Sequence, residues 1–115
     1  MKYSTRTRRS LVAMFKLALA NLPDGLRGGY ATYSCSSPYI CDTIRRNTSD
    51  YEAADVATDF IAERIGYMFS IEAWLKSQSE EVAEAVRYDV VFNDGKKLQA
   101  YRKDWLRSLI KEFKD

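Results

Sequence analysis

The residues with the clearest chemical potential in this 115-residue chain are two cysteines, Cys35 and Cys41, and the adjacent carboxylate Asp42. Thiolates and carboxylates bind metal ions, and paired thiols carry out redox reactions. The chain has no histidine and only two cysteines, which excludes zinc sites built from cysteine and histidine or from three or four cysteines. The C-x5-C spacing also differs from the C-x-x-C redox motif. We therefore expect both thiols to be reduced and to pack as small apolar groups, with no bound metal.

Catalytic groups other than cysteine are equally sparse. Acid–base catalysis without histidine would depend on carboxylates, tyrosine, cysteine or lysine, and no serine or cysteine is paired with a base in the sequence. The segment GLRGGY at residues 25–30 contains glycines suited to a phosphate, yet it matches neither the P-loop nor the dinucleotide-binding motif. The sequence therefore predicts a protein that is not an enzyme and that uses no cofactor.

The elements that carry these residues are predicted to be helices. We expect an all-α fold. Residues 10–115 should form a single small domain of about five or six helices with one long loop, and residues 1–9 a basic N-terminal tail. The expected helices cover residues 9–22, 38–47, 50–65, 71–78, 80–92 and 96–114. Serine hydroxyls cap helix starts, which assigns N-caps to Ser37, Ser49, Ser70 and Ser79. The last residues of the fifth helix, 90–92, could alternatively be extended.

The apolar side chains of these helices define a core with two charged exceptions. The third helix is expected to turn inward Ala53, Val56, Phe60, Ile61 and Ile65. The last helix is expected to bury Leu98, Tyr101, Trp105, Leu109, Ile110 and Phe113. Trp74 and Trp105 should both be largely buried. Arg64 and Arg102 project from the same faces, so each must pair inside the fold, reach past its neighbours to water or contact a partner.

Charge is distributed in blocks along the chain. Residues 1–48 carry eight basic and two acidic side chains, residues 49–94 three and eleven, and residues 95–115 seven and three. One face of the third helix carries Glu52, Asp55, Asp59 and Glu63, and the polar side of the last helix carries Lys103, Arg107, Lys111 and Lys114. Because both helices turn their apolar faces to the core, the two rows are expected on different sides of the molecule. Each row is either an ordinary solvated surface or the contact for a partner of opposite charge.

The sequence PDGLRGGYATYSCSS at residues 23–37 has neither helical nor strand periodicity. Loops of this length in a compact domain are often functional. Arg27, Tyr30 and Tyr33 are therefore candidates for a contact surface, although the two tyrosines could instead cover the core.

Four fragments of the chain, in this order, resemble a group of small, mostly uncharacterised accessory proteins of tailed bacteriophages: YICDTI, IAERIG, SIEAWL and KLQAYRKDWLRSLIKEF. The matching features are an ICDAL-like stretch, an RLG-like helix end, a capped helix ending in WL, and a terminal QAxRxxWLxxLI helix, over roughly residues 39–113. The resemblance implies no catalytic residues. It implies a phage-encoded protein made inside a bacterium, where such proteins commonly bind and redirect or inhibit host proteins, including defence systems.

Two classes of function follow. The first is a modulator or inhibitor that binds a host bacterial protein through the loop candidates or the acidic row. The second is a nucleic-acid-binding protein whose basic N-terminus and last helix contact phosphates. Its candidate residues are Arg6, Arg8, Arg9, Lys103, Arg107 and Lys111. A virion or assembly component is a third option, and the oligomeric state is left open.

The expected location is the host bacterial cytoplasm, with no membrane contact. The longest weakly charged run, residues 10–22, is much shorter than the ~20 apolar residues that span a bilayer. The N-terminal region also has no secretory signal pattern.

Overall fold

The computed structural model describes residues 3–26, 40–65, 75–76 and 78–114. This part of the chain forms helices and contains no strand: α1 (Thr5–Asn21), α2 (Ile40–Arg46), α3 (Tyr51–Ile65), α5 (Glu80–Phe92) and α6 (Lys96–Phe113). The predicted all-α fold is therefore confirmed. The expected fourth helix falls mostly on residues 66–74 and 77, outside the described residues, as do the predicted caps Ser37 and Ser70.

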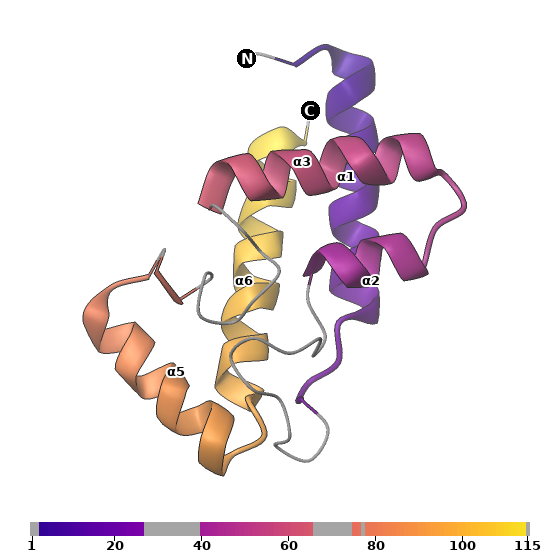
Figure 1. Cartoon of the computed structure of the whole chain (residues 1–115). Helices are drawn as coiled ribbons and strands as arrows, with labels where there is room; N and C mark the ends of the chain where they lie inside the picture. The colour runs from indigo at the N-terminus through magenta and orange to yellow at the C-terminus, as the bar shows by residue number, and fades with distance from the viewer. Residues whose placement is uncertain (1–2, 27–39, 66–74, 77, 115) are drawn as a thin grey trace.

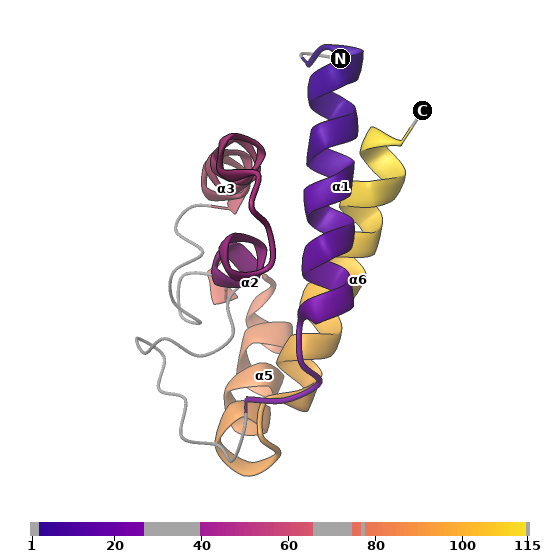
Figure 2. The same ribbon diagram turned by 90° about the vertical axis from the view of Figure 1, so that its right-hand side faces the viewer.

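The helices form two layers (Figures 1 and 2). The long helices α1 and α6 lie side by side and run in opposite directions, so that the start of α1 and the end of α6 lie at the same end of the molecule. Helices α2 and α3 cross one face of this pair, and α5 extends from the start of α6. Antiparallel packing of α1 and α6 brings the two basic ends of the sequence together.

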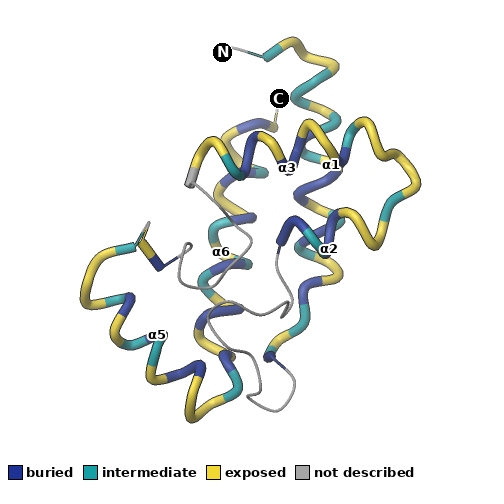
Figure 3. Tube along the Cα trace, in the orientation of Figure 1, coloured by how far each residue is buried: buried dark blue, intermediate teal, exposed yellow. Residues whose placement is uncertain are grey.

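The core lies between these layers, where the buried positions of α1, α2, α3 and α6 face one another (Figure 3). Each described helix contributes fully buried aliphatic side chains to this core: Leu11, Ile40, Ile44, Ile61, Val86, Leu98 and Leu106. Near the chain ends four rings, Tyr3, Phe15, Phe60 and Phe113, pack with neighbouring centroids 5.1–6.2 Å apart. The tilted and edge-on ring pairs are those that aromatic quadrupoles favour.

Helix starts follow local capping chemistry, with two corrections to the sequence predictions. Ser79 caps α5 as predicted, because its hydroxyl accepts a hydrogen bond from the Val82 amide at 3.3 Å. Helix α3 is capped by Asp50 and not by Ser49, since the Asp50 carboxylate accepts from Ala53 at 3.0 Å. The predicted tail at residues 1–9 is wrong for residues 5–9, which form the first turns of α1 behind the cap Ser4. Serine and aspartate can both cap the free amides of a first turn, so the sequence alone did not decide between Ser49 and Asp50 as the cap of α3.

The face that α6 buries differs from the predicted one. Its buried residues are Leu98, Gln99, Arg102, Leu106, Leu109 and Phe113. The predicted Tyr101, Trp105 and Ile110 are only partly buried. Helix α1 packs along α6, and the buried arc of α6 includes Gln99 and Leu106, whereas Trp105 lies at its edge. Trp74 lies outside the described residues.

Helix α3 shows a similar shift. Phe60 and Ile61 are buried as predicted, and Ala53 packs partly against the core. Val56 is 38% exposed, and its predicted place in the core is taken by Ala54 and Ala57. The buried arc of α3 thus includes two small residues that the pattern of large apolar side chains did not indicate. The side chain of Ile65 lies outside the described residues. In α5, residues 90–92 are helical, which rules out the extended alternative.

The segment after α1 is fixed against the turn between α5 and α6. The Leu26 amide donates to the Asp94 carbonyl oxygen at 2.6 Å, and Gln99 donates to the Pro23 carbonyl oxygen at 3.0 Å. A Cβ at Gly25 would meet a carboxylate oxygen of Asp94 at 2.5 Å, so a larger residue there would have to displace the Asp94 side chain. Residues 23–26 therefore belong to the folded domain, and they link the first helix to the last.

Candidate functional site

The predicted acidic row occupies the outer face of α3. Glu52, Asp55, Asp59 and Glu63 are all exposed, because Ala54, Ala57 and Ile61 on the opposite side of the helix face the core. Asp55 of this row forms an ion pair with Arg45 of α2 at 3.2 Å. Arg45 also donates to the Thr58 hydroxyl at 3.1 Å, so it joins α2 to α3. The row is exposed as predicted, and its centre is partly neutralised.

Two apolar side chains accompany these carboxylates. Tyr51 is 70% exposed and Val56 is 38% exposed, and at ~100° per residue both fall on the edges of the same helix face. We name this surface the acidic face: Tyr51, Glu52, Asp55, Val56, Asp59 and Glu63. At its N-terminal end the face borders a hollow between α3 and the start of α1, lined by Arg6, Thr7, Ser10, Asp50, Glu52, Ala53 and Val56. The face thus combines charge, an exposed ring and a depression.

Arg64 and Arg102, the two arginines expected among apolar residues, both have partners within the fold. The Arg64 guanidinium donates to both carboxylate oxygens of Glu112 on α6, at 2.7 and 2.9 Å, and lies 5.5 Å from the centre of the Phe60 ring. Arg102 is fully buried and donates to the Gln99 side chain at 2.9 Å. Each arginine therefore has a partner from the same chain, an exposed carboxylate for Arg64 and a buried amide oxygen for Arg102.

The basic candidates are divided by the fold. Arg6 lies beside α3 in the hollow at the acidic face, and Arg8 is half-buried. Lys103 forms an ion pair with Asp24, which lowers the pKa of that carboxyl through a hydrogen bond and the nearby positive charge. Arg107 pairs with Asp104 at 2.7 Å. Two of the six predicted basic residues, Lys103 and Arg107, are thus engaged in ion pairs within the fold.

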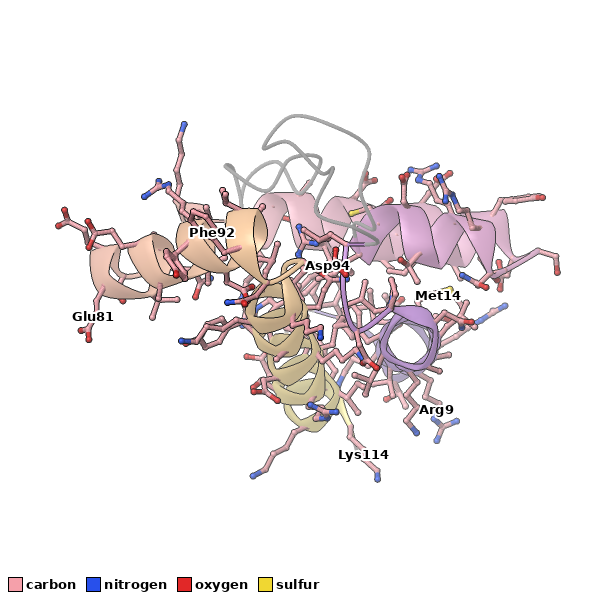
Figure 4. All side chains as sticks on the ribbon, turned by 90° about the horizontal axis from the view of Figure 1, so that it is seen from below. Arg9, Met14, Glu81, Phe92, Asp94 and Lys114 are labelled. Carbon is pink, nitrogen blue, oxygen red and sulfur yellow. The ribbon has the colours of Figure 1, made fainter. Side chains whose placement is uncertain are left out.

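A smaller basic site remains at the common end of α1 and α6. Arg9 and Lys114 line one hollow together with Val12 and Phe113, and Figure 4 shows both long side chains extending from the same side of the molecule. Lys111 is exposed one turn before Lys114 on α6. Arg9 and Lys114 are 105 positions apart in sequence numbering. Their proximity depends on the antiparallel packing of the two helices.

Helix α5 carries an exposed apolar surface that the sequence prediction missed. Tyr88, Val91 and Phe92 are 62%, 58% and 66% exposed, and the Tyr88 and Phe92 ring centroids lie 4.6 Å apart. Ala83, Val86 and Val90 on the other side of the helix are buried against the core. The signal was available, because a helix with apolar residues on both sides cannot bury them all against one neighbour.

The cysteine chemistry weighed at the outset is absent at Cys41. This thiol is unbonded and almost fully buried, and burial raises its pKa from 9.0 to about 11 despite the nearby Arg45. A protonated, enclosed thiol is a poor nucleophile and a poor metal ligand, so Cys41 packs as an apolar group as predicted. Cys35 lies outside the described residues, as do the loop candidates Arg27, Tyr30 and Tyr33.

No group of three or more potential metal ligands is found within the residues that the structure describes. None of the helices in that part of the chain is long and apolar enough to cross a membrane.

Comparison with known proteins adds no relative: no protein-family model, no curated protein and no solved structure matches the chain.

Proposed function

We propose that this chain is a small helical binding protein that attaches to a basic surface of a partner protein through the acidic face of α3. The observation that carries the proposal is the exposure of four carboxylates together with Tyr51 on one helix face. Glu52 and Asp59 form no ion pair with any residue in the described part of the chain. Exposed ion pairs add only ~0–1 kcal/mol each to stability, so folding gives little reason for this alignment.

The composition of the acidic face suits protein recognition. Carboxylates speed encounter with a basic surface and fix its orientation. Tyr51 supplies a ring that a partner can bury, and tyrosine is enriched among the residues that dominate interface energetics. The hollow beside Val56 offers a depression for a partner side chain.

The resemblance to tailed-phage accessory proteins supports a more specific form of this proposal. The chain would be made in an infected bacterium and would bind, modulate or inhibit a host protein in the host cytoplasm, with a defence system among the candidates. The resemblance is associational, and the acidic face supplies the physical basis for binding.

The test compares two charge reversals in pull-downs from nuclease-treated bacterial lysate. Asp59→Lys alters the acidic face and breaks no ion pair formed within the described residues. Glu80→Lys on α5 is the matched control, with the same change in net charge at another exposed helical position. We expect Asp59→Lys to reduce capture of the partner, most strongly at low salt, because salt screens exposed charges. Asp59→Lys should keep the wild-type melting temperature, and Glu80→Lys should lower it slightly, because a positive charge in the first turn of α5 opposes the helix dipole. Equal capture by all three proteins would reject the acidic face as the binding surface.

A second candidate function, nucleic-acid binding, is favoured by the proximity of Arg9 and Lys114. Cations from both chain ends could contact neighbouring phosphates at this end of the α1–α6 pair. The test is fluorescence anisotropy with labelled DNA and RNA over a salt series. If this function holds, Arg9→Ala/Lys114→Ala should lower the salt-dependence slope by about 2. We expect weak binding that disappears near physiological salt, and tight binding there would favour this candidate over the first.

A further inference from the structure

The exposed surface of α5 is a continuous stripe with different chemistry at its two ends. At ~100° per residue, Glu81, Tyr88 and Phe92 share one face, with Glu84 and Val91 along its edge. We name these five residues the α5 stripe. Its first half is acidic and its second half is apolar, and Figure 4 shows Glu81 and Phe92 at opposite ends of the helix.

Basic residues lie just beyond the apolar end. A hollow at the turn between α5 and α6 is lined by Val91 and Phe92 on one side and by Lys96 and Lys97 on the other, together with Asp89, Asn93 and Asp94. Both lysines are exposed. Glu81, Glu84, Lys96 and Lys97 form no ion pair with any residue that the structure describes. The acidic residues of α5, its exposed apolar residues and the two lysines of α6 therefore follow one another in this order along the chain.

This order of charges is self-complementary. If a second copy of α5 lies antiparallel across the first, with a two-fold axis near Tyr88, the acidic end of each copy faces the basic end of the other. With a rise of ~1.5 Å per residue, Glu81 lies roughly 10 Å before Tyr88 along the helix, and Lys96 and Lys97 follow the turn that comes after Phe92. The apolar residues of both copies meet at the centre. An isologous contact of this kind closes on itself as a dimer.

We propose that the α5 stripe is a homodimer interface in which Tyr88, Val91 and Phe92 pack across a two-fold axis and Glu81 and Glu84 face Lys96 and Lys97 of the second copy. The partner is another molecule of this chain, because a single surface presents both halves of the charge pattern. The contact lies on α5 and does not use the acidic face of α3, so it is independent of the proposed function. One helix pair is smaller than a standard protein interface, and the dimer should dissociate on dilution.

The first test is sedimentation of the full chain over a concentration series up to about 1 mM, a range that detects weak association. We expect a reversible monomer–dimer equilibrium. Tyr88→Ser/Phe92→Ser should raise the dissociation constant at least about tenfold, because aromatic residues dominate such interfaces. Tyr51→Ser is the matched control, since this equally exposed ring lies on α3. A wild-type chain that stays monomeric throughout, or a dimer whose dissociation constant Tyr88→Ser/Phe92→Ser leaves unchanged, would overturn the proposal.

The second test examines the antiparallel arrangement. Glu81→Lys/Glu84→Lys should weaken self-association, and so should Lys96→Glu/Lys97→Glu, because each variant places like charges at both ends of the interface. An equimolar mixture of the two variants should restore dimers, since opposite charges then face each other at both ends. Circular dichroism of each variant checks that the fold is intact. Failure of the mixture to associate, with both variants folded, would exclude this geometry.

Discussion

The carboxylate of Asp89 in α5 accepts a hydrogen bond from the backbone amide of Leu98 in α6 at 3.0 Å, and the same oxygen accepts from the Lys97 amide at 2.8 Å. Helix α6 begins behind Gly95, which has no side chain to cap it. Asp89 supplies this cap from the preceding helix, and it is itself buried. Its backbone oxygen also accepts from the amides of Asn93 and Gly95, so one residue fixes the turn between the two helices.

Asp89→Ala should therefore lower the free energy of unfolding by about 1–3 kcal/mol, because it leaves two amides at the start of α6 without their acceptor. Asp89→Asn keeps a side-chain oxygen and should cost less. Urea denaturation followed by circular dichroism measures both values. Equal stability of Asp89→Ala and the wild type would show that the cap contributes nothing.

Leu106→Ala should destabilise the protein more than Trp105→Ala. Leu106 is fully buried between α6 and its neighbours, and its truncation should cost about 2–5 kcal/mol. Trp105 is only partly buried, so its truncation should cost less than the ~3–5 kcal/mol typical of a core tryptophan. The midpoints of urea denaturation give the order directly. A greater loss of unfolding free energy for Trp105→Ala would show that α6 buries the face that the sequence pattern predicted.

The Arg64–Glu112 pair should contribute little to stability despite its good geometry. Both side chains are more than a third exposed, and solvent screens such pairs to about 0.2–1 kcal/mol. A double-mutant cycle with Arg64→Ala and Glu112→Ala isolates the coupling energy, which should shrink in high salt. A coupling above about 2 kcal/mol would mean that the pair is much less hydrated than its exposure indicates.

Cys41 should make stability fall in alkaline solution. Burial raises its pKa from 9.0 to about 11 in the folded protein. Below pH 9 the thiol is protonated in both states and its contribution is complete, whereas between pH 9 and about 11 only the unfolded chain releases the proton. The resulting loss reaches up to about 3 kcal/mol at 1.4 kcal/mol per pH unit.

Other groups also titrate in this range, so the measurement is a difference. Unfolding free energies of the wild type and Cys41→Ala are compared at several pH values from 8 to about 11. The gap between the two proteins should narrow as pH rises, because the variant lacks the buried thiol. Parallel curves would contradict the raised pKa.

The sequence by itself determined the helical class, the approximate extent of each described helix, the Ser79 cap and the exposure of the acidic row. Each of these depends on residues within about one or two turns of one another, through hydrophobic periodicity, capping spacing or the angle between positions on one helix. The same local rules identified Arg64 and Arg102 as charges that needed a partner. They could not say which partner each would find.

Tertiary structure decided the contacts between residues distant in sequence. Arg64 and Glu112 are 48 positions apart, and Arg9 meets Lys114 only because α1 and α6 pack antiparallel. The choice of Leu106 over Trp105 for burial likewise depends on how the neighbouring helices pack against α6. An amphipathic pattern fixes a broad apolar arc, and the neighbouring helices then select the part of that arc that is shielded from water. The apolar part of the α5 stripe stays exposed for the same reason, since α5 has more apolar surface than its packing against α6 can cover.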